Sequence, residues 1–375
     1  MLKFLFVSHV RLNLKSNVPQ MKSITIVFFL LSISIMRLSA QSYSIASIDA
    51  MLKEMTLNDK FSGAVLIADK SHILLSKGYG YADRENKTLN TPNTRFNLSS
   101  ASKVFVGTVI TRLAQQHKLK FTDTIGKYIS GLPKGNTITI HQILTHSAGF
   151  NDFFNAKGFS YKGIKNCTDM LPFMKSMPLV YTPGDSCIYS TGNTIILGAV
   201  VEKITGMSFQ DYFRSSIGKP LNLVNTVFTP YWTLNENQKQ YAVGYTKDST
   251  RIKRRPYDYD QGFIPLSAGG AWSSIVDLYK FDHAVFSAKL TNQKHLRLMT
   301  AEYTPQWGNS HFGYIWITTD NKDRSFIGHP GDSSGWHAMN AHYIKQGYTV
   351  IILTNFGFVD QYELLSKVEH FLFDK

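Results

Sequence analysis

The sequence predicts an α/β fold in which strands from both ends of the chain build one sheet, interrupted by a mostly helical segment. Near the N-terminus, residues 63–68 and 73–81 are β-rich runs joined by four polar residues, a pattern typical of a hairpin. Near the C-terminus, three short segments are also rich in β-forming residues: 325–329, 336–343 and 348–354. Because helical patterns fill the stretch between these two sets, the sheet has to draw on both ends of the chain.

Helix signals dominate the middle of the chain. Apolar residues recur every four positions from Ile196 and stop at Gly206, which predicts a helix that ends at this glycine. A last helix is expected to begin near Asp360, with its apolar residues on one face. After a leader of residues 1–40, we therefore assign the sheet domain to residues 41–115 and 263–375, and the helical insertion to residues 116–262.

The composition is typical of a folded globular protein. The 375 residues allow one large domain or two intertwined ones, and 43% are hydrophobic and 18% charged. Low-complexity tracts and internal repeats are absent from the sequence, which excludes disordered and collagen-like classes. Cys167 and Cys187 form no C-x-x-C pair and lack clustered histidines, so no zinc site is expected. A disulfide between them and two buried thiols both remain open.

The first forty residues differ from the rest. They contain five Lys or Arg and no acidic residue, and an apolar stretch at 24–35 leads to small residues ending at Ala40. This arrangement is typical of a cleaved signal peptide, with Met21 as an alternative start, and the stretch is short for a membrane span. We therefore expect a periplasmic or secreted protein that is cleaved near Ala40 and keeps no stable membrane span.

The formal net charge of the chain is +14, and removing the leader leaves 35 basic and 26 acidic residues. This excess fits attraction to an anionic surface such as cell wall or lipid headgroups, and it fits equally well a charge that serves solubility alone. Basic residues are scattered except at 253–255, where a solvated loop is expected. Nucleic acid binding agrees poorly with export and is not expected, and we expect a monomer.

Ser100 and Lys103 are the most informative pair of residues. A serine hydroxyl is a weak nucleophile that needs a neighbouring base, and residues three apart share one face of a helix. Ser99 and Ser100 are residue types favoured at helix N-caps, so a helix is expected to begin at the serine. A second S-x-x-K match at 216–219 runs directly into Pro220 and is interpreted as a helix end.

Two further short motifs lie at suggestive places. Tyr189 follows a Pro-Gly turn and precedes a helix, where a tyrosine can relay a serine proton or simply be half-buried in a loop. His329 ends a predicted strand before Gly331, where a histidine can touch substrate and a glycine lets the backbone approach closely. The alternative there is a turn with a satisfied histidine. Residues 144–149 are interpreted as structural packing near the site.

These motifs occur in a characteristic order, together with a few others: residues 78–80, 95–103, 144–149, 189–191, 268–270 and 329–331. In this order the chain resembles the serine β-lactamase-like and penicillin-binding-protein-like hydrolases. The branch is that of class C β-lactamases, D,D-carboxypeptidases, D-aminopeptidases and related esterases. The resemblance extends over residues 61–355. It implies a β-lactamase/transpeptidase-like fold, with an antiparallel sheet flanked by helices and a mostly helical insertion.

The resemblance also implies roles for individual residues. Ser100 would be the acylated nucleophile, and Lys103 the base that takes its proton, shared with Tyr189. The backbone N–H groups of Ser100 and Asp332 would form the oxyanion hole. His329 and Gly331 would belong to the substrate-binding third motif, and Thr191 would line the cleft. No cofactor and no metal is implied.

Two positions depart from the family pattern. Thr191 stands where an asparagine usually contacts the substrate's acyl amide, and Asn193 lies close by but out of register. His329 replaces the lysine of the Lys-Thr-Gly motif common in class C β-lactamases, which removes a point charge for a substrate carboxylate. A histidine there is more typical of the peptidase and esterase members. No acidic residue is identified as a deacylation base.

We therefore expect an exported serine hydrolase that forms an acyl-enzyme at Ser100 and cleaves small esters or amides, including D-amino-acid peptides. Two alternatives are a β-lactamase, and a silent penicillin-recognition module that binds without turnover. An α/β-hydrolase is disfavoured: residues 331–335 match its G-x-S-x-G elbow, with Asp360 and His370 downstream, but a strand follows instead of the required helix. No H-x-x-x-H spacing with an acid supports a metalloenzyme.

Overall fold

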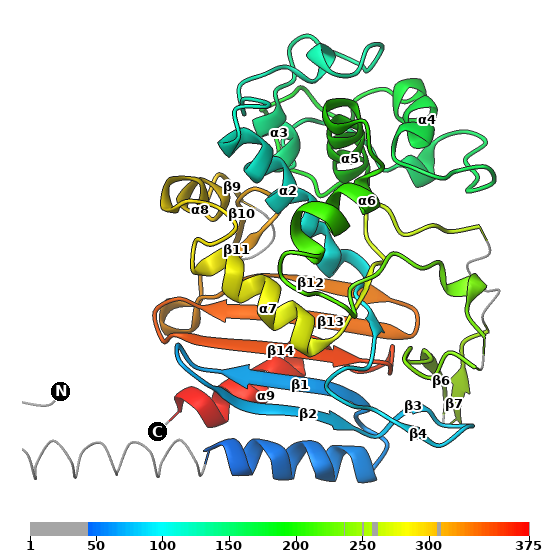
Figure 1. Cartoon of the computed structure of the whole chain (residues 1–375), viewed down its shortest axis with the longest axis vertical. Helices are drawn as coiled ribbons and strands as arrows, with labels where there is room; N and C mark the ends of the chain where they lie inside the picture. Colours follow the sequence, from blue (N-terminus) through cyan, green and yellow to red (C-terminus); the bar gives the residue numbers. More distant parts are fainter. Residues whose placement is uncertain (1–43, 236, 250, 257–261, 306–308, 375) are drawn as a thin grey trace, which may run out of the picture.

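The computed structural model describes residues 44–374 except 236, 250, 257–261 and 306–308. The predicted signal peptide and its cleavage point at Ala40 lie outside the described residues. The main sheet has eight strands in the order β2-β1-β14-β13-β12-β11-β10-β9; in Figure 1 it runs from β2 near the bottom up to β9, which lies beside α8. Every neighbouring pair in it is antiparallel.

The strands of this sheet come from the two ends of the chain, as predicted. They are β1 (Gly63–Ala68), β2 (Ile73–Tyr79), β9 (Thr304–Pro305), β10 (Ser310–Phe312), β11 (Ile317–Thr319), β12 (Ile327–Ser333), β13 (Trp336–Tyr343) and β14 (Tyr348–Thr354). The join between the two ends is the β1–β14 pair, in which Val65 lies opposite Ile352. The N-terminal hairpin and the strands at 336–343 and 348–354 are therefore confirmed, whereas the strand predicted at 325–329 lies at Ile327–Ser333, and β9, β10 and β11 were not predicted.

Alternation along β1 separates two hydrophobic layers. Ala64 and Leu66 point toward one face, where α7 (Ile275–Phe286) packs, and Val65 and Ile67 point toward the other. That second face is covered by α9 (Gln361–Phe373) and by the helix at residues 44–57. Figure 1 shows α7 crossing in front of the sheet and α9 behind it. Burial on both faces explains why β1 is a continuous apolar run.

The remaining helices lie mainly at the upper end of the molecule in Figure 1. They are α2 (Lys103–Gln115), α3 (Ile140–Leu144), α4 (Leu171–Ser176), α5 (Thr191–Thr205), α6 (Phe209–Phe213) and α8 (Gln293–Met299). Their buried residues join those under α7 in one hydrophobic cluster. The domain boundaries drawn from the sequence stay a prediction.

The residues that end α5 and begin α9 are the ones that the sequence predicted. The C-cap of α5 is Gly206, with a left-handed φ of 69° that glycine adopts without steric cost. The N-cap of α9 is Asp360, whose carboxylate accepts from the backbone N–H groups of Tyr362 and Glu363. The second S-x-x-K match lies at the end of the helix that contains Arg214–Gly218.

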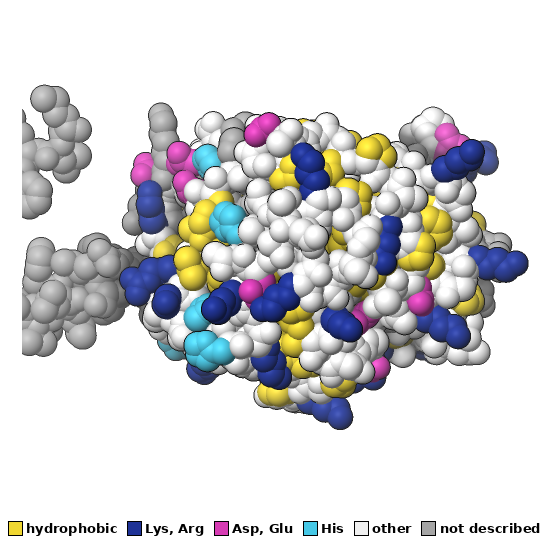
Figure 2. All heavy atoms as spheres, turned by 90° about the horizontal axis from the view of Figure 1, so that it is seen from above, with side chains coloured by type: hydrophobic (Ala, Val, Ile, Leu, Met, Phe, Trp, Pro, Cys, Tyr) yellow, Lys and Arg dark blue, Asp and Glu magenta, His cyan; other side chains and the backbone are white. Residues whose placement is uncertain are grey.

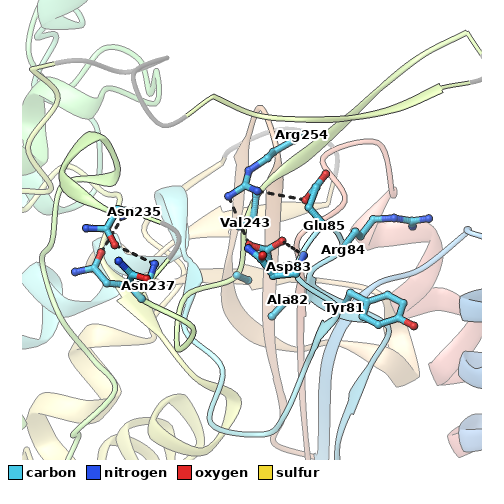
Figure 3. A network of polar contacts seen from close by, with 12 residues as sticks. Tyr81, Ala82, Asp83, Arg84, Glu85, Asn235, Asn237, Val243 and Arg254 are labelled. Carbon is cyan, nitrogen blue, oxygen red and sulfur yellow. Dashed lines mark hydrogen bonds and ion pairs between the residues drawn. The ribbon is translucent and has the colours of Figure 1, made fainter.

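Three small two-stranded sheets surround the main one: β3 (Tyr81–Asp83) with β4 (Thr88–Leu89), β5 (Phe96–Asn97) with β8 (Trp272–Ser273), and β6 (Tyr245–Asp248) with β7 (Arg251–Arg254). Figure 3 shows Arg254 reaching from β7 to the carboxylates of Asp83 and Glu85. These N–O distances are 3.5 Å and 3.4 Å. The ion pairs link the end of β7 to the end of β3 and to the turn that follows it.

Figure 2, seen from above the helical end, shows Lys and Arg side chains scattered over this face rather than gathered in one patch. In the part of the chain that the structure describes, no helix combines the length and the apolar character needed to cross a membrane.

Candidate active site

Ser100 lies on the 3-10 turn η1 (Ser99–Ser102), between β5 and α2, and Lys103 is the first residue of α2. Lys103 Nζ donates a hydrogen bond to Ser100 Oγ at 2.8 Å. The lysine is 2% exposed, and Ser100 is half-buried. The i, i+3 spacing therefore brings the hydroxyl and the amine into contact, in the arrangement that an activated nucleophile needs.

The turn itself is built differently from the expected helix N-cap. Neither of the two predicted cap residues caps α2, whose N-cap is Ser102 without a side-chain cap bond. Ser99 has a φ of 49°, and its N–H donates to Asn97 Oδ1 at 2.9 Å while its Oγ donates to Ser333 Oγ at 2.7 Å. The cap prediction was wrong because Ser99 instead ties the turn to the β12–β13 hairpin.

Gly331 lets β12 lie directly against this turn. A Cβ at Gly331 would lie 2.0 Å from the carbonyl oxygen of Leu98 and 2.9 Å from the amide nitrogen of Ala101. Both neighbours are backbone atoms that cannot move without shifting Ser100. The backbone at Gly331 therefore approaches η1 closely, as the sequence predicted, and only a residue without a side chain fits there.

Tyr189 lies beside Lys103, which it faces with its ring. Lys103 Nζ is 5.2 Å from the ring centroid, a cation–π distance. The Tyr189 hydroxyl is buried and has no hydrogen-bond partner among the described residues. The structure therefore brings Tyr189 to the Ser100–Lys103 pair, but the contact that it shows is made by the ring and not by the hydroxyl.

His329 is buried beside the same lysine. Its Nδ1 lies 2.6 Å from the carbonyl oxygen of Pro330, so Nδ1 carries the hydrogen and donates it. Burial and then the positive charge of Lys103 lower the pKa of His329 to about 3, and the ring is neutral at physiological pH. Nε2 is consequently an acceptor, and it lacks a partner among the described residues.

His146, in the segment interpreted as structural, completes the buried surroundings of Tyr189. Its Nδ1 accepts from the Ser190 N–H at 3.2 Å and from Asn193 Nδ2 at 3.1 Å, and its ring centroid is 5.0 Å from that of Tyr189. Burial, followed by His329 and Lys103, holds its pKa well below the usual value. Asn193 thus binds a buried histidine.

Thr191 starts α5 and is held there by a carboxylate from another segment. Asp152 Oδ1 accepts from the backbone N–H of Thr191 and from that of Gly192, the latter at 3.2 Å. A carboxylate at a helix N-terminus is favoured by the helix dipole. Asp152 therefore positions the start of α5, directly after Tyr189 in the sequence.

A cleft of about 410 Å³ lies at this site. Its lining includes four of the predicted residues: Ser100, Lys103, Thr191 and Asp332. The Asp332 side chain is 72% exposed, and its Oδ1 lies 3.4 Å from His337 Nε2. The other three predicted residues are not part of this lining: Tyr189 and His329 lie beside Lys103, and Gly331 lies against the backbone of η1.

Sequence reasoning missed several residues of the cleft, above all Arg255. A solvated loop was expected at 253–255, but Arg255 is 4% exposed, and its guanidinium lies 5.2 Å from the ring centroid of Trp336. Its carbonyl oxygen accepts from Tyr231 Oη at 2.9 Å. The prediction was wrong here because Arg251–Arg254 form the strand β7, and Arg255 directly after it donates its backbone N–H to the carbonyl oxygen of Gly244 at 2.8 Å. The lining residues not predicted as part of the site include Phe153, Phe154, Tyr161, Arg255, Phe263 and Trp336.

The structure also bears on the cysteines, on the G-x-S-x-G match and on metal binding. Cys167 and Cys187 are free thiols, the first buried and the second half-buried. The G-x-S-x-G match lies on β12 and its turn to β13, so no helix follows its serine, and His370 pairs with Asp374. Across the described residues, no group of three or more His, Cys, Asp or Glu is arranged to hold a metal ion.

Comparisons with known proteins agree with this geometry. The putative penicillin-binding protein PbpX of Bacillus subtilis (strain 168) is 29% identical over 293 residues, which is 78% of this chain and 70% of that protein. The teichoic acid D-alanine hydrolase of Staphylococcus aureus is 29% identical over 253 residues, 66% of this chain and 61% of that protein. The chain thus spans less than two thirds of this second relative.

The fold is also shared with a solved structure. The D-amino acid amidase of Ochrobactrum anthropi SV3 superposes with a TM-score of 0.75 at 19% sequence identity, covering 88% of this chain and 98% of the amidase. A family model described as Beta-lactamase matches residues 48–365. The chain therefore belongs to the Beta-lactamase family and is a serine hydrolase of the β-lactamase fold.

Proposed function

We propose that this protein is an exported hydrolase that forms an acyl-enzyme at Ser100 and cleaves small esters or amides, including D-aminoacyl derivatives. The observation that carries the proposal is the 2.8 Å contact between Ser100 Oγ and the buried Lys103 Nζ in a cleft. Two similar proteins, named as a teichoic acid D-alanine hydrolase and a D-amino acid amidase, support the substrate class.

The reaction proceeds in two halves. Once Lys103 has lost its ammonium proton, its amine accepts the hydroxyl proton as Ser100 Oγ attacks the substrate carbonyl carbon, and the proton then passes to the leaving alcohol or amine as its bond to that carbon breaks. Water attacks the resulting ester in the second half, releasing the acid and returning the proton to Ser100. Backbone N–H groups of Ser100 and Asp332 hold the oxyanion, each worth about 3 kcal/mol.

Tyr189 and His329 take part in proton handling beside Lys103. The Tyr189 hydroxyl and the neutral His329 Nε2 are both buried without partners among the described residues. Buried polar groups cost free energy unless they are paired, so such groups next to a nucleophile indicate a catalytic use. A donor–acceptor hydroxyl and a bare acceptor nitrogen are the groups that a relay from the lysine requires.

Asp332 favours substrates that carry a free amine. Its carboxylate is exposed in the cleft lining, where it can pair with the ammonium group of an aminoacyl substrate. The departures at Thr191 and His329 remove the amide and the point charge that the family's β-lactamases use for their substrates. A D-alanyl ester or amide therefore fits the site better than a β-lactam.

The proposal is tested with a hydrolysis panel of a nitrophenyl acetate, a D-alanine ester, nitrocefin and a D-Ala-D-Ala peptide. Ser100→Ala should abolish turnover, and Lys103→Ala should cost nearly as much because the two residues act as a unit. Ser216→Ala, in the second S-x-x-K match, is the matched control and should keep full activity. Intact mass after a fluorophosphonate should show one adduct on the wild type and none on Ser100→Ala. Parent-rate hydrolysis by Ser100→Ala would refute the assignment.

Export is tested separately. When the full chain is expressed with its leader, N-terminal sequencing of the mature protein should begin at Gln41, directly after the predicted cleavage point at Ala40. An intact leader on the protein that accumulates would contradict this part of the proposal without affecting the chemistry at Ser100.

A further inference from the structure

Four aromatic side chains form one wall of the cleft beside Ser100: Phe153, Phe154, Tyr161 and Phe263. We call them the aromatic wall. The centroids of Phe153 and Phe154 are 4.3 Å apart, and those of Tyr161 and Phe263 are 5.2 Å apart. Phe159 links the two pairs, at 5.1 Å from Phe153 and 4.8 Å from Tyr161. The rings are therefore a continuous packed surface.

Phe154 is the member of the aromatic wall whose ring is largely exposed to solvent. It is 55% exposed, whereas the neighbouring Phe153 is 1% exposed. Other large apolar residues with high exposure, such as Leu57, do not line the cleft. A half-exposed phenyl ring inside a cleft that also contains a nucleophile–base pair is typical of a ligand-contact surface.

The wall is held in place before any substrate arrives. Phe153 begins the short turn η3 (Phe153–Asn155), and the preceding residue, Asp152, is bound to the start of α5. On the other side, a Cβ at Gly270 would lie 2.7 Å from the Phe263 ring, so the glycine makes room for that ring. The carbonyl oxygen of Phe263 accepts from Trp232 Nε1 at 3.0 Å. Such preorganisation reduces the entropy cost of binding.

We propose that the aromatic wall binds a phenyl-sized apolar group of the substrate, so that this hydrolase prefers esters and amides that carry such a group. The inference rests on the proposed function, because it assigns a selectivity to hydrolysis at Ser100. Covering a half-exposed phenyl ring with a second ring is expected to raise kcat/KM about tenfold over a methyl group, equal to about 1.4 kcal/mol.

The test uses three esters with small partner groups, because a nitrophenyl group would itself occupy the wall. Methyl acetate is the reference, and methyl phenylacetate and benzyl acetate are isomers that place the phenyl group on the acyl or the alcohol side. Acid release is followed in a pH-stat for the wild type, for Phe154→Ala and for Leu57→Ala, whose exposed leucine lies outside the cleft.

We expect the wild type and Leu57→Ala to prefer one phenyl ester over methyl acetate by about tenfold. Phe154→Ala should bring that preference close to one, because it removes the half-exposed ring that the phenyl group would cover. The wild type should also be inhibited more strongly by benzylboronic acid than by methylboronic acid, and Phe154→Ala should reduce this difference as it reduces the ester preference. This binding readout also serves if turnover of simple esters is slow.

Two results overturn the inference: no preference for either phenyl ester, or a preference that Phe154→Ala leaves unchanged. A failure of the proposed function gives a different result from either of these. If Ser100 is not the nucleophile, the wild type hydrolyses none of the esters faster than Ser100→Ala does, and neither boronic acid binds.

Discussion

Asp282 is a buried carboxyl group on α7 whose ionisation should make the protein less stable at alkaline pH. Both of its oxygens are 3.5 Å from Asn340 Nδ2, and the Oδ1 of that asparagine accepts from the backbone N–H of His329 at 2.9 Å. Burial raises the pKa of Asp282 to about 8, against a smaller opposing effect of the Asn340 hydrogen bond. The folded protein therefore holds a proton that the unfolded chain releases near pH 3.8.

The sign of the effect follows from this difference. Because the folded state binds the proton more tightly, the free energy of unfolding falls as the pH rises from about 4 to 8. Below that window both states are protonated, and Asp282 then has no stability cost. Between pH 5 and pH 8 the loss is on the order of 4 kcal/mol, since one pKa unit corresponds to about 1.4 kcal/mol.

Asp282→Asn removes the ionisation while keeping the size and the acceptor for Asn340. Its advantage over the wild type in free energy of unfolding should grow by about 4 kcal/mol between pH 5 and pH 8. Urea unfolding at both pH values measures this, with Asp185→Asn, at an exposed aspartate, as the control. A difference between wild type and Asp282→Asn that is the same at both pH values would refute the reasoning.

Two further substitutions test the backbone and the buried histidine of the site. Gly331→Ala places a Cβ 2.0 Å from the Leu98 carbonyl oxygen. It should cost about 1–3 kcal/mol of stability and, by shifting Ser100, lower kcat on the order of a hundredfold; an alanine variant with wild-type kinetics would contradict this. His146→Asn keeps an acceptor near Nδ1 for the Ser190 N–H, whereas His146→Gln leaves it unpaired, at a cost of about 1–3 kcal/mol. Asparagine also tolerates the φ of 56° at this position better. Thermal unfolding should therefore rank Asn above Gln, and equal stability of the two variants would count against the assigned contacts.

Features that depend on neighbours in the sequence were predictable. Gly206 ends α5 and Asp360 begins α9 because caps act within one turn of a helix. The contact between Ser100 and Lys103 also follows from local geometry, since the two residues are three positions apart on a helical path. The cap prediction at Ser99 and Ser100 failed because the bond from Ser99 to Ser333 joins residues far apart in the chain.

The residues that surround the Ser100–Lys103 pair could not be predicted from neighbours in the sequence. Arg255 packs on Trp336 and accepts from Tyr231, which come from other parts of the chain, and the aromatic wall joins residues 153–161 to Phe263. The unpaired His329 Nε2 depends on which atoms surround it in three dimensions.

The N-terminal hairpin, the last two strands, the end of α5, the start of α9, the family resemblance and the nucleophile–base pair all followed from the sequence, because periodicity, caps and short spacings act over a few residues. The pairing of β1 with β14, the burial of individual charges and the rings that line the cleft depend on the folded chain as a whole. Those outcomes arise from packing between segments that lie up to about 290 residues apart, as Val65 and Ile352 do. No local sequence pattern specifies which residues from distant parts of the chain will pack against each other.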